Sequence, residues 1–502
     1  MTRIVAGLGE LNGGKKVYAI FVLCAATAIS LPAQTFTTLF SFDGNEIGST
    51  DGYDPYFGAL VQATNGDFYG TTIGGGTGGW GTLFKITPSG VLTTLYNFCY
   101  PTCAVSGGMP WAGLLQARNG DLYGTTPSGG ENGVCPGLGC GTVYKITPGG
   151  SLTTLYTFCS QSGCTDGSGP NGGLVQATNG DLYGMSRGGG ANNGGTVFKI
   201  TSSGTLTTLY SFCSQSGCTD GSGPYAGLIQ ATDGNLYGTT ESGGSSNGYG
   251  TVFKITPGGS LTTLYTFCSQ SGCTDGAVPF SGLVQATNRE FYGTTLEGGA
   301  NNGGTVYKIT SSGTLTTLYS FCSQSGCTDG SGPYAGLIQA TDGNLYGTTN
   351  HGGANGDGTV FKITPGGTLT TLYSFCSQTG CTDGSGLITG LVQATNGKFY
   401  GTTQAGGAHQ NSGTIFSLSV GLGPFVETQT TSGKVGAAVK ILGTNLAGAT
   451  SVTFNGTAAV FTVNSTGSAI SATVPSGATT GTVEVVTPRG RLMSNVPFRV
   501  LP

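Results

Sequence analysis

Short runs rich in apolar and β-branched residues recur along residues 35–420 and predict β-strands. In one stretch these runs are GLIQAT (227–232), NLYGTT (235–240), GTVFKIT (250–256) and LTTLYTF (261–267). Val, Ile, Thr, Tyr and Phe dominate them, as is typical of strands. The intervening TDGN and PGGS segments supply the positive φ angles that tight hairpins require. The pattern predicts four antiparallel strands, here called a, b, c and d in chain order.

This four-strand unit occurs seven times. Each b strand carries an aromatic-Tyr-Gly or Leu-Tyr-Gly step, and the steps lie 54 or 55 residues apart except for one interval of 60. Their tyrosines are Tyr69, Tyr123, Tyr183, Tyr237, Tyr292, Tyr346 and Tyr400. Neighbouring apolar residues such as Leu264 and Tyr265 point to opposite faces of a strand, so both faces of each sheet must be covered. Seven such sheets predict an all-β fold, a seven-bladed β-propeller.

The two ends of the repeated region are complementary. It opens with TFTTLFSF (35–42), which has the pattern of a d strand, whereas the last unit, 390–420, has a, b and c strands and no d strand. We therefore expect the N-terminal strand to complete the last blade, which removes the open sheet edges of an unclosed array. The alternative is an open β-solenoid, which needs no displaced strand.

Two further regions flank the repeats. Residues 1–34 combine Arg3, Lys15 and Lys16 with an apolar run at 17–31 and predict an export signal cleaved near Ala33 or Gln34. A retained membrane anchor is the alternative, and no later segment is long and apolar enough to span a membrane. Residues 422–502 lack the repeat landmarks and show short alternating strands, which predicts an immunoglobulin-like β-sandwich.

Both folded regions resemble known families. The pattern GLVQATNGDLYGTT followed by GTVFKIT resembles the GloVer tandem repeat of exported bacterial proteins, over roughly residues 35–420. This resemblance implies a secreted repeat protein and no particular chemistry. The segments VKILGTNL, SVTFNG, ISATVPSGATTG and VEVVTPRG resemble the TIG (IPT) domain. That resemblance implies a spacer or interaction module.

Composition narrows the partners. Only 8% of the residues are charged, the net charge is -4, and no run of Lys and Arg exists to meet phosphates, which argues against nucleic acid. The chain has 96 glycines, but its 37% hydrophobic residues argue against a disordered glycine-rich protein. We expect a monomer located outside the cell or at its surface.

Fourteen cysteines follow the export signal in close pairs. The pairs are Cys99/Cys103, Cys135/Cys140, Cys159/Cys164, Cys213/Cys218, Cys268/Cys273, Cys322/Cys327 and Cys376/Cys381. Local pairing in an exported chain predicts disulfides, each worth on the order of 2 kcal/mol for so small a ring. Thiolate metal sites are the alternative, but each pair offers only two of the four ligands of structural zinc, and His351 and His409 are the only histidines.

The cysteine loops place candidate binding residues on one face. Each loop connects strand d to the next strand a, and this connection shares a rim with the b–c loop. The recurring carboxylates Asp166, Asp220, Asp275, Asp329 and Asp383 could bind calcium or could stabilise their own turns. Trp111, Tyr225, Phe280 and Tyr334, with Tyr56, follow a proline at the start of the innermost strand and could bind sugars or fill space, whereas Asn171 and Ile388 interrupt this set.

These features favour a secreted, non-enzymatic protein that binds an extracellular glycan or a cell-surface polymer. The chain has no HExxH, no GxSxG with a matching histidine and no P-loop, so we expect no catalytic residue and no cofactor, with calcium as the one possibility. The first alternative is an extracellular enzyme acting on polysaccharide, with Glu131, Glu241 and Glu297 as its candidate carboxylates. The second is a structural or adhesion protein of the cell envelope.

Overall fold

The computed structural model describes residues 34–44, 50–99, 106–130, 139–244, 248–409 and 411–501. The predicted export signal, apart from Gln34, lies outside these ranges. The secondary-structure elements that lie wholly within these ranges are β-strands and five short 3-10 helices. The helices are η1 (Ser162–Cys164), η2 (Ser216–Cys218), η3 (Ser271–Cys273), η4 (Ser325–Cys327) and η5 (Thr379–Cys381). Within the described ranges, no helix has the length and apolar character needed to cross a membrane.

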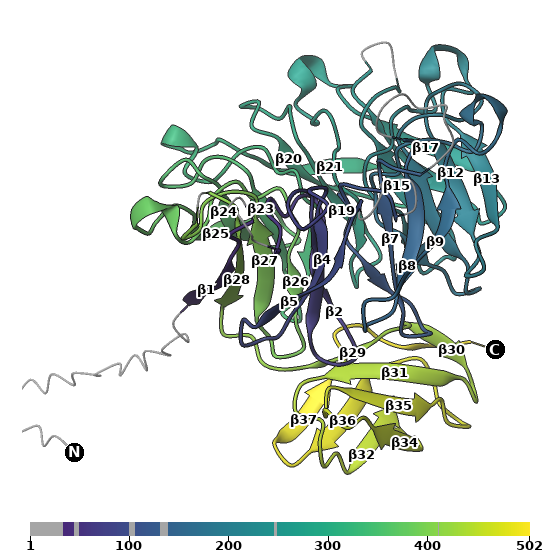
Figure 1. Cartoon of the computed structure of the whole chain (residues 1–502), viewed down its shortest axis with the longest axis vertical. Helices are drawn as coiled ribbons and strands as arrows, with labels where there is room; N and C mark the ends of the chain where they lie inside the picture. Colours follow the sequence, from purple (N-terminus) through teal and green to yellow (C-terminus); the bar gives the residue numbers. More distant parts are fainter. Residues whose placement is uncertain are drawn as a thin grey trace, which may run out of the picture.

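Residues 34–420 form seven four-stranded antiparallel sheets, numbered here in chain order (Figure 1). Sheets 1 to 3 contain β2 (Val61–Gln62), β3 (Phe68–Thr72), β4 (Thr82–Ile86) and β5 (Leu92–Asn97); β6 (Leu115–Gln116), β7 (Leu122–Thr126), β8 (Thr142–Ile146) and β9 (Leu152–Thr157); and β10 (Val175–Gln176), β11 (Leu182–Ser186), β12 (Thr196–Ile200) and β13 (Leu206–Ser211). Sheets 4 to 6 contain β14 (Ile229–Gln230), β15 (Leu236–Thr240), β16 (Thr251–Ile255) and β17 (Leu261–Thr266); β18 (Val284–Gln285), β19 (Phe291–Thr295), β20 (Thr305–Ile309) and β21 (Leu315–Ser320); and β22 (Ile338–Gln339), β23 (Leu345–Thr349), β24 (Thr359–Ile363) and β25 (Leu369–Ser374). The four strands per unit are thus confirmed.

Sheet 7 joins the two ends of the repeated region. Its strands are β26 (Val392–Gln393), β27 (Phe399–Thr403), β28 (Thr414–Ser419) and β1 (Thr35–Ser41). β1 pairs with β28 in antiparallel register, with Thr35 opposite Ser419 and Ser41 opposite Thr414. The prediction that the N-terminal strand completes the last sheet is therefore confirmed.

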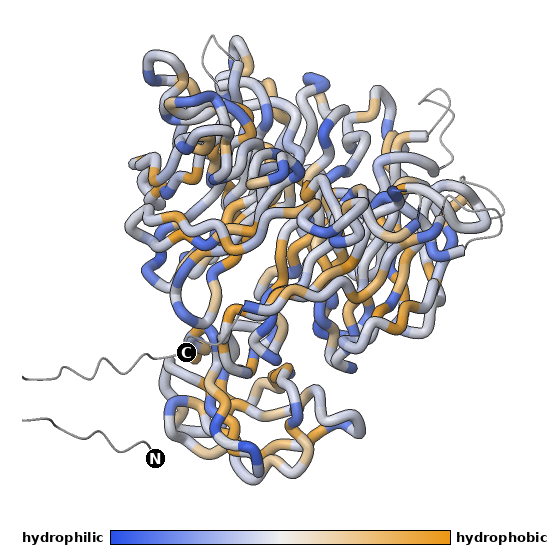
Figure 2. Tube along the Cα trace, turned by 90° about the vertical axis from the view of Figure 1, so that its left-hand side faces the viewer, coloured by the Kyte–Doolittle hydropathy of each residue, from blue (hydrophilic) through white to orange (hydrophobic). Residues whose placement is uncertain are grey.

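The hydrophobic core lies between successive sheets. Strands b and c are almost entirely buried in every unit, and Figure 2 shows hydrophobic segments running through the interior of both folded regions. The glycine of the Leu-Tyr-Gly step is required because a Cβ at Gly238 would lie 2.7 Å from the Phe253 ring and 2.8 Å from Leu228. One cluster contains Phe84 of sheet 1 together with Tyr400 and Ile415 of sheet 7, so the last sheet packs against the first.

A cycle of hydrogen bonds connects all seven sheets. In each sheet, a backbone N–H in the a–b turn donates to the glutamine Oε1 of the next sheet, at 2.8–3.0 Å. The donor–acceptor pairs are Thr64–Gln116, Arg118–Gln176, Thr178–Gln230, Thr232–Gln285, Thr287–Gln339, Thr341–Gln393 and Thr395–Gln62. Because the last pair returns to sheet 1, the cycle is closed.

Residues 422–501 form a separate two-sheet β domain, here called the C-terminal domain. One sheet contains β29 (Val426–Thr428), β31 (Ala438–Gly443), β35 (Ala469–Thr473) and β34 (Phe461–Val463); the other contains β33 (Thr457–Ala458), β32 (Ser451–Phe454), β36 (Val483–Thr487) and β37 (Gly490–Met493). A parallel pair, β30 (Ser432–Lys434) with β38 (Arg499–Leu501), completes it. The two sheets enclose their own core, which includes Ile441, Val452 and Phe498.

The C-terminal domain lies against the a–b turns of the seven-sheet domain, below it in Figure 1. Asn464 Nδ2 and Ser468 Oγ donate to Thr64 O at 3.1 and 2.6 Å, and Arg499 Nη1 donates to Thr232 O at 2.7 Å. Phe425 N donates to Thr395 O at 3.0 Å. These contacts cover the face that carries the a–b turns and leave the opposite face, with the cysteine loops, uncovered.

Glu427 of β29 makes this contact sensitive to pH. Gln429, two residues along the chain, bonds through its side chain to Gln116 of the seven-sheet domain, so Glu427 faces the same side. Burial raises the pKa of its carboxyl from 4.5 to about 7. Because the proton is held more tightly in the folded state, the stabilisation is complete below about pH 4.5 and is lost as the pH rises through about 7.

We therefore expect Glu427→Gln to remove most of this pH dependence. Glu427 is half-buried, so the loss in the parent protein between these two pH values should be on the order of 1–2 kcal/mol. Urea unfolding at a series of pH values measures it, with the exposed Glu297→Gln as control. Equal slopes in the parent and in the Glu427→Gln variant would contradict this prediction.

Candidate functional site

The long loops of the seven-sheet domain share one face, as the strand order predicts. The b–c loop of a sheet bonds to the cysteine loop that precedes that sheet in the chain: Gly190 N donates to Cys164 O and Gly244 N donates to Cys218 O, both at 2.9 Å. The same bond recurs in three further units. This face is called the cysteine-loop face below.

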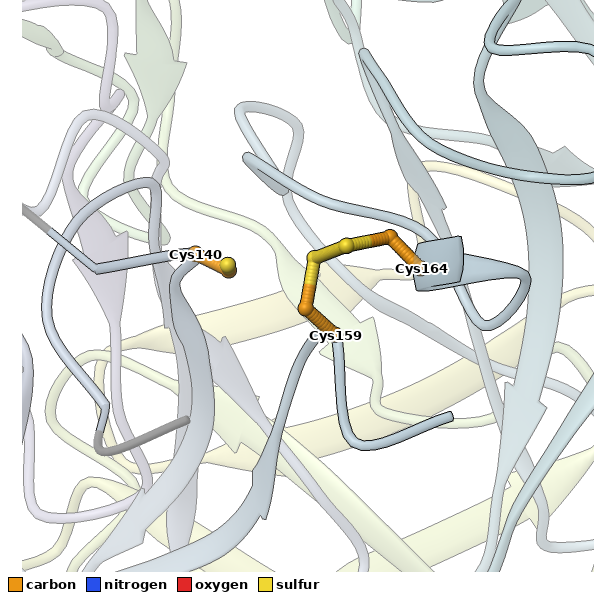
Figure 3. Close-up of side chains that lie close together, drawn as sticks. All are labelled: Cys140, Cys159 and Cys164. Carbon is orange, nitrogen blue, oxygen red and sulfur yellow. A yellow bond between two sulfur atoms is a disulfide. The ribbon is translucent and has the colours of Figure 1, made fainter. Parts of the chain in front are cut away.

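Five of the predicted disulfides are present, namely Cys159–Cys164, Cys213–Cys218, Cys268–Cys273, Cys322–Cys327 and Cys376–Cys381. Cys103 and Cys135 lie outside the described residues, so the Cys99/Cys103 and Cys135/Cys140 pairings stay predictions. Figure 3 shows the side chain of Cys140 beside the Cys159–Cys164 disulfide, with the three sulfurs within 4.8 Å of one another. Because two of the three sulfurs are bonded together, this group does not offer three thiolate ligands.

The five recurring carboxylates are buried inside their own cysteine loops. Asp166 Oδ2 accepts hydrogen bonds from Tyr156 OH at 2.8 Å, from Ser160 N at 2.9 Å and from Ser160 Oγ at 3.0 Å. Asp220, Asp275, Asp329 and Asp383 accept the equivalent bonds. All of these donors come from the same cysteine loop or from the d strand that leads into it, so the contacts favour a role in holding the loop. Calcium or ligand binding by these residues stays a prediction.

The aromatic residues that follow the proline meet at the centre of the cysteine-loop face. Together with Phe57 they form the central aromatic cluster, which consists of Tyr56, Phe57, Trp111, Tyr225, Phe280 and Tyr334. The ring centroids of Tyr225 and Phe280 lie 4.0 Å apart, and those of Phe280 and Tyr334 lie 5.6 Å apart. Tyr225 is buried and the other five are half-buried. Five sheets contribute to the cluster.

Phe57 lies among the other rings and was not expected from the sequence. Its centroid lies 5.2 Å from that of Tyr225, 5.6 Å from that of Phe280 and 6.1 Å from that of Tyr334. The corresponding residues of the other units are small: Ala112, Gly172, Ala226, Ser281, Ala335 and Thr389. One bulky residue at a position that is otherwise small is the signal that could have identified it.

A central cavity of about 250 Å³ adjoins this cluster. Phe57, Tyr225, Phe280 and Tyr334 line it, together with glycines and alanines that follow the aromatic positions along the chain. Ile388 and the buried Asn171 line it too, at the positions that interrupt the aromatic set. The cavity therefore combines aromatic faces with exposed backbone groups, as small-molecule sites often do.

The predicted carboxylates and histidines of this face are separate groups. Glu241 Oε1 accepts from Arg187 Nη2 at 2.7 Å and from Arg187 Nε at 2.9 Å. The Arg187 guanidinium carbon lies 5.6 Å from the Tyr225 ring centroid. Glu297 is exposed, and Glu131 lies outside the described residues. His351 contacts Asn350, His409 is exposed, and among the described residues neither histidine belongs to a group of three possible metal ligands.

Asp54 is a second residue near this cluster that the sequence pattern did not indicate as a candidate binding residue. It precedes Pro55 at the edge of the central aromatic cluster, and its φ is 59°. Within the described residues, its Oδ1 is buried without a hydrogen-bond partner. Burial raises the pKa of Asp54 to about 6, although a hydrogen bond with Gln404 opposes the rise. The charge of Asp54 also raises the pKa of Tyr56, after the larger effect of burial.

Comparison with known proteins finds one family. The model of the Gloeobacter/Verrucomicrobia repeat matches three overlapping segments, residues 24–245, 137–289 and 224–470. No curated protein matches the chain. The match continues beyond residue 420 into the C-terminal domain.

The similar solved structures have little sequence identity with this chain. The extracellular domain assigned to a hybrid two-component system of B. thetaiotaomicron is 12% identical with a TM-score of 0.48, and the match covers 94% of this chain and 59% of that one. A fungal alcohol oxidase of the AA5 family, in complex with copper, is 11% identical with a TM-score of 0.47, covering 90% and 98%. An auxiliary nutrient binding protein of Bacteroides ovatus is 13% identical with a TM-score of 0.37, covering 77% and 76%. Likeness at this level carries no functional argument.

Proposed function

Because the chain belongs to the Gloeobacter/Verrucomicrobia repeat family, we propose that it is an extracellular, non-enzymatic binding protein whose seven sheets are the blades of a β-propeller. Its ligand is a glycan or a cell-surface polymer, bound at the central aromatic cluster. The C-terminal domain is an immunoglobulin-like domain of the TIG (IPT) type and acts as a spacer or second contact.

The propeller interpretation is supported by the closed cycle of glutamine hydrogen bonds. Each sheet bonds to the next through one such bond, and Thr395 of sheet 7 bonds to Gln62 of sheet 1. Phe42, which follows β1, also packs against Phe84 of sheet 1 with centroids 5.5 Å apart. An open solenoid has no reason to bring its last unit onto its first, so these contacts favour a ring.

The proposed position of the binding site rests on the sequence positions at which the seven units differ. Most strand positions repeat nearly unchanged, whereas the residue at the aromatic position varies from Trp to Tyr, Phe, Asn and Ile, and these residues converge at one opening. Packing alone would favour the same residue in every unit. Flat aromatic faces suit sugar rings, because they offer apolar area with few rotamers to lose. The opposite face is covered by the C-terminal domain, which leaves this opening for the ligand.

An extracellular location is supported by the cysteines. Five disulfides in one chain are typical of an oxidising compartment, and the predicted export signal at residues 1–34 is consistent with it. The rigid loops limit the ordering cost of binding at the face that they surround. We propose that the secreted protein acts as a monomer.

Binding of an immobilised oligosaccharide panel tests the function. We expect Trp111→Ala to weaken binding at least about tenfold, because one aromatic face contributes roughly 1–2 kcal/mol, and to leave the melting temperature nearly unchanged. Tyr249→Ala is the matched control, since Tyr249 is an exposed aromatic residue in a b–c loop of the same face.

Three outcomes of this experiment would count against the proposal. Absence of binding to every oligosaccharide would contradict it, and destabilisation of the Trp111→Ala protein by several kcal/mol would assign the residue to the core. Release of shortened oligosaccharides would instead favour the enzyme. Repeating the measurement with EDTA tests calcium.

A further inference from the structure

The residue two places before the aromatic position is equivalent in all seven units, and a proline follows it in six of them and Leu387 in the seventh. In each unit its N–H donates to a carbonyl of the preceding unit, as Asp54 N donates to Ser412 O and Gly223 N donates to Gly194 O. The seven residues are Asp54, Met109, Gly169, Gly223, Val278, Gly332 and Gly386, and all have positive φ angles of 55–67°. Asp54 is the only charged member.

Asp54 is unfavourable for the stability of the protein in two ways. A left-handed backbone costs a residue with a side chain more than it costs the glycines at four of the equivalent positions. Its buried Oδ1 has no partner among the described residues, so this oxygen has lost water without a replacement, although the carboxyl also has a hydrogen bond with Gln404. Residues that combine strain with an unpaired polar group are concentrated at functional sites.

Among the described residues, no cationic side chain balances the charge of Asp54. Its pKa is shifted by burial and by Gln404, and no cationic side chain of the described residues contributes. Tyr56 lies close enough for the charge of Asp54 to raise the pKa of its hydroxyl, after the larger effect of burial, and Tyr334 lies near Tyr56. Arg187 lies over Tyr225 and is paired with Glu241. His409 is exposed in the loop that contains Ser412.

We propose that Asp54 and the central aromatic cluster bind an ammonium group of the ligand, so that the glycan of the proposed function carries amino sugars. The ammonium donates to the unpaired Oδ1 of Asp54 and lies against the neighbouring aromatic faces, which attract cations. This inference rests on the proposed function. A neutral hydroxyl could donate to the same oxygen but would leave the buried charge unbalanced.

Two oligosaccharides that differ only in charge test the inference. Glucosamine oligomers carry free amines, and N-acetylglucosamine oligomers have the same rings with neutral acetamides. At a pH just above the Asp54 pKa, we expect Asp54→Gly to weaken binding of the amine form at least about tenfold and to leave binding of the acetylated form within about twofold. Glu297→Gln, which removes an exposed carboxylate of the same face, is the control.

Asp54→Gly also separates a binding role from a structural one. Glycine stands at this position in four other units, so we expect the variant to melt at the same temperature as the parent or higher. A residue needed for the fold would lower the melting temperature instead. Asp54→Asn, which keeps the size of the side chain, should lose amine binding as Asp54→Gly does.

Tetramethylammonium separates failure of this inference from failure of glycan binding. Its charge does not titrate, so its binding to the parent should weaken as the pH falls through about 6 and Asp54 becomes protonated. Asp54→Gly retains His351 and His409, and we expect it to bind weakly with a flat pH profile. If the parent binds acetylated oligomers but binds tetramethylammonium and free amines no more tightly than Asp54→Gly does, the inference is wrong and the glycan site stands. If it binds tetramethylammonium through Asp54 but no oligosaccharide, the proposed glycan function is wrong and the ammonium site stands.

Discussion

Deletion of residues 35–42 is expected to abolish cooperative unfolding of the seven-sheet domain. The deletion removes β1 and leaves β28 as an unpaired edge. It also removes Phe36, whose ring lies 4.0 Å from that of Tyr373 and 5.4 Å from that of Phe416, and the fully buried Phe42. Loss of one buried aromatic side chain costs about 3–5 kcal/mol, so these two together approach the whole stability of a typical domain.

Calorimetry of the protein without residues 1–34 measures this effect. Thr37→Ala serves as the control, because Thr37 is an exposed residue of the same strand. A synthetic peptide of residues 35–42 should restore a cooperative transition if the missing strand is the cause. A deletion protein that melts like its parent would contradict the closed ring.

Asp329→Ala should be the most destabilising single substitution in a cysteine loop, by about 3–5 kcal/mol. The carboxylate accepts hydrogen bonds from Tyr319 OH and Ser323 Oγ, and from Ser323 N at 2.9 Å. Its removal leaves Ser323 N without this acceptor, and leaves the two hydroxyls with only each other, 2.7 Å apart. Chemical denaturation measures the loss. Ser323→Ala, which removes a single donor, should cost only about 1 kcal/mol.

The pH dependence of the difference in unfolding free energy between the parent and Asp329→Ala provides a second check. Burial alone would raise the pKa of Asp329, but hydrogen bonds from Ser323 and Tyr319 outweigh it and lower the pKa below 3.8. The stabilisation is therefore complete above the unfolded pKa and is lost as the pH falls through the folded value. The gap between the parent and Asp329→Ala should narrow in acid, and a gap that widens there would contradict this assignment.

The strand pattern was predictable because packing between sheets makes the same demand in every unit. The Leu-Tyr-Gly step and the displaced N-terminal strand could both be recognised from this repetition.

The a strands were predicted too long: GLIQAT suggests six residues, whereas β14 contains Ile229–Gln230. The inner ends crowd together near the centre, where a Cβ at Gly227 would lie 2.9 Å from Gly173 O of the neighbouring sheet. This crowding depends on the assembled ring and leaves no local sequence signal.

The candidate site was less predictable because it is built from residues that do not recur. Trp111 and Tyr225 were found because an aromatic residue follows the proline in most units. Asp54 and Phe57 each occur once at their positions, so no repeated pattern marks them. In a repeat protein of this kind, the deviations of single units from the shared pattern are as informative as the pattern itself.

The position of the C-terminal domain affects how the ring can open. The pairing of β1 with β28 inside sheet 7 is the one place where the ring is closed without a direct chain connection. The C-terminal domain bonds to both sides of it, to Thr395 of sheet 7 through Thr444 and Phe425 and to Thr64 of sheet 1 through Ser468. The C-terminal domain therefore holds the two sides of this closure together, and it must detach before the ring can open. A chain lacking this domain would keep its seven sheets, but the ring would open faster and become accessible to proteases faster.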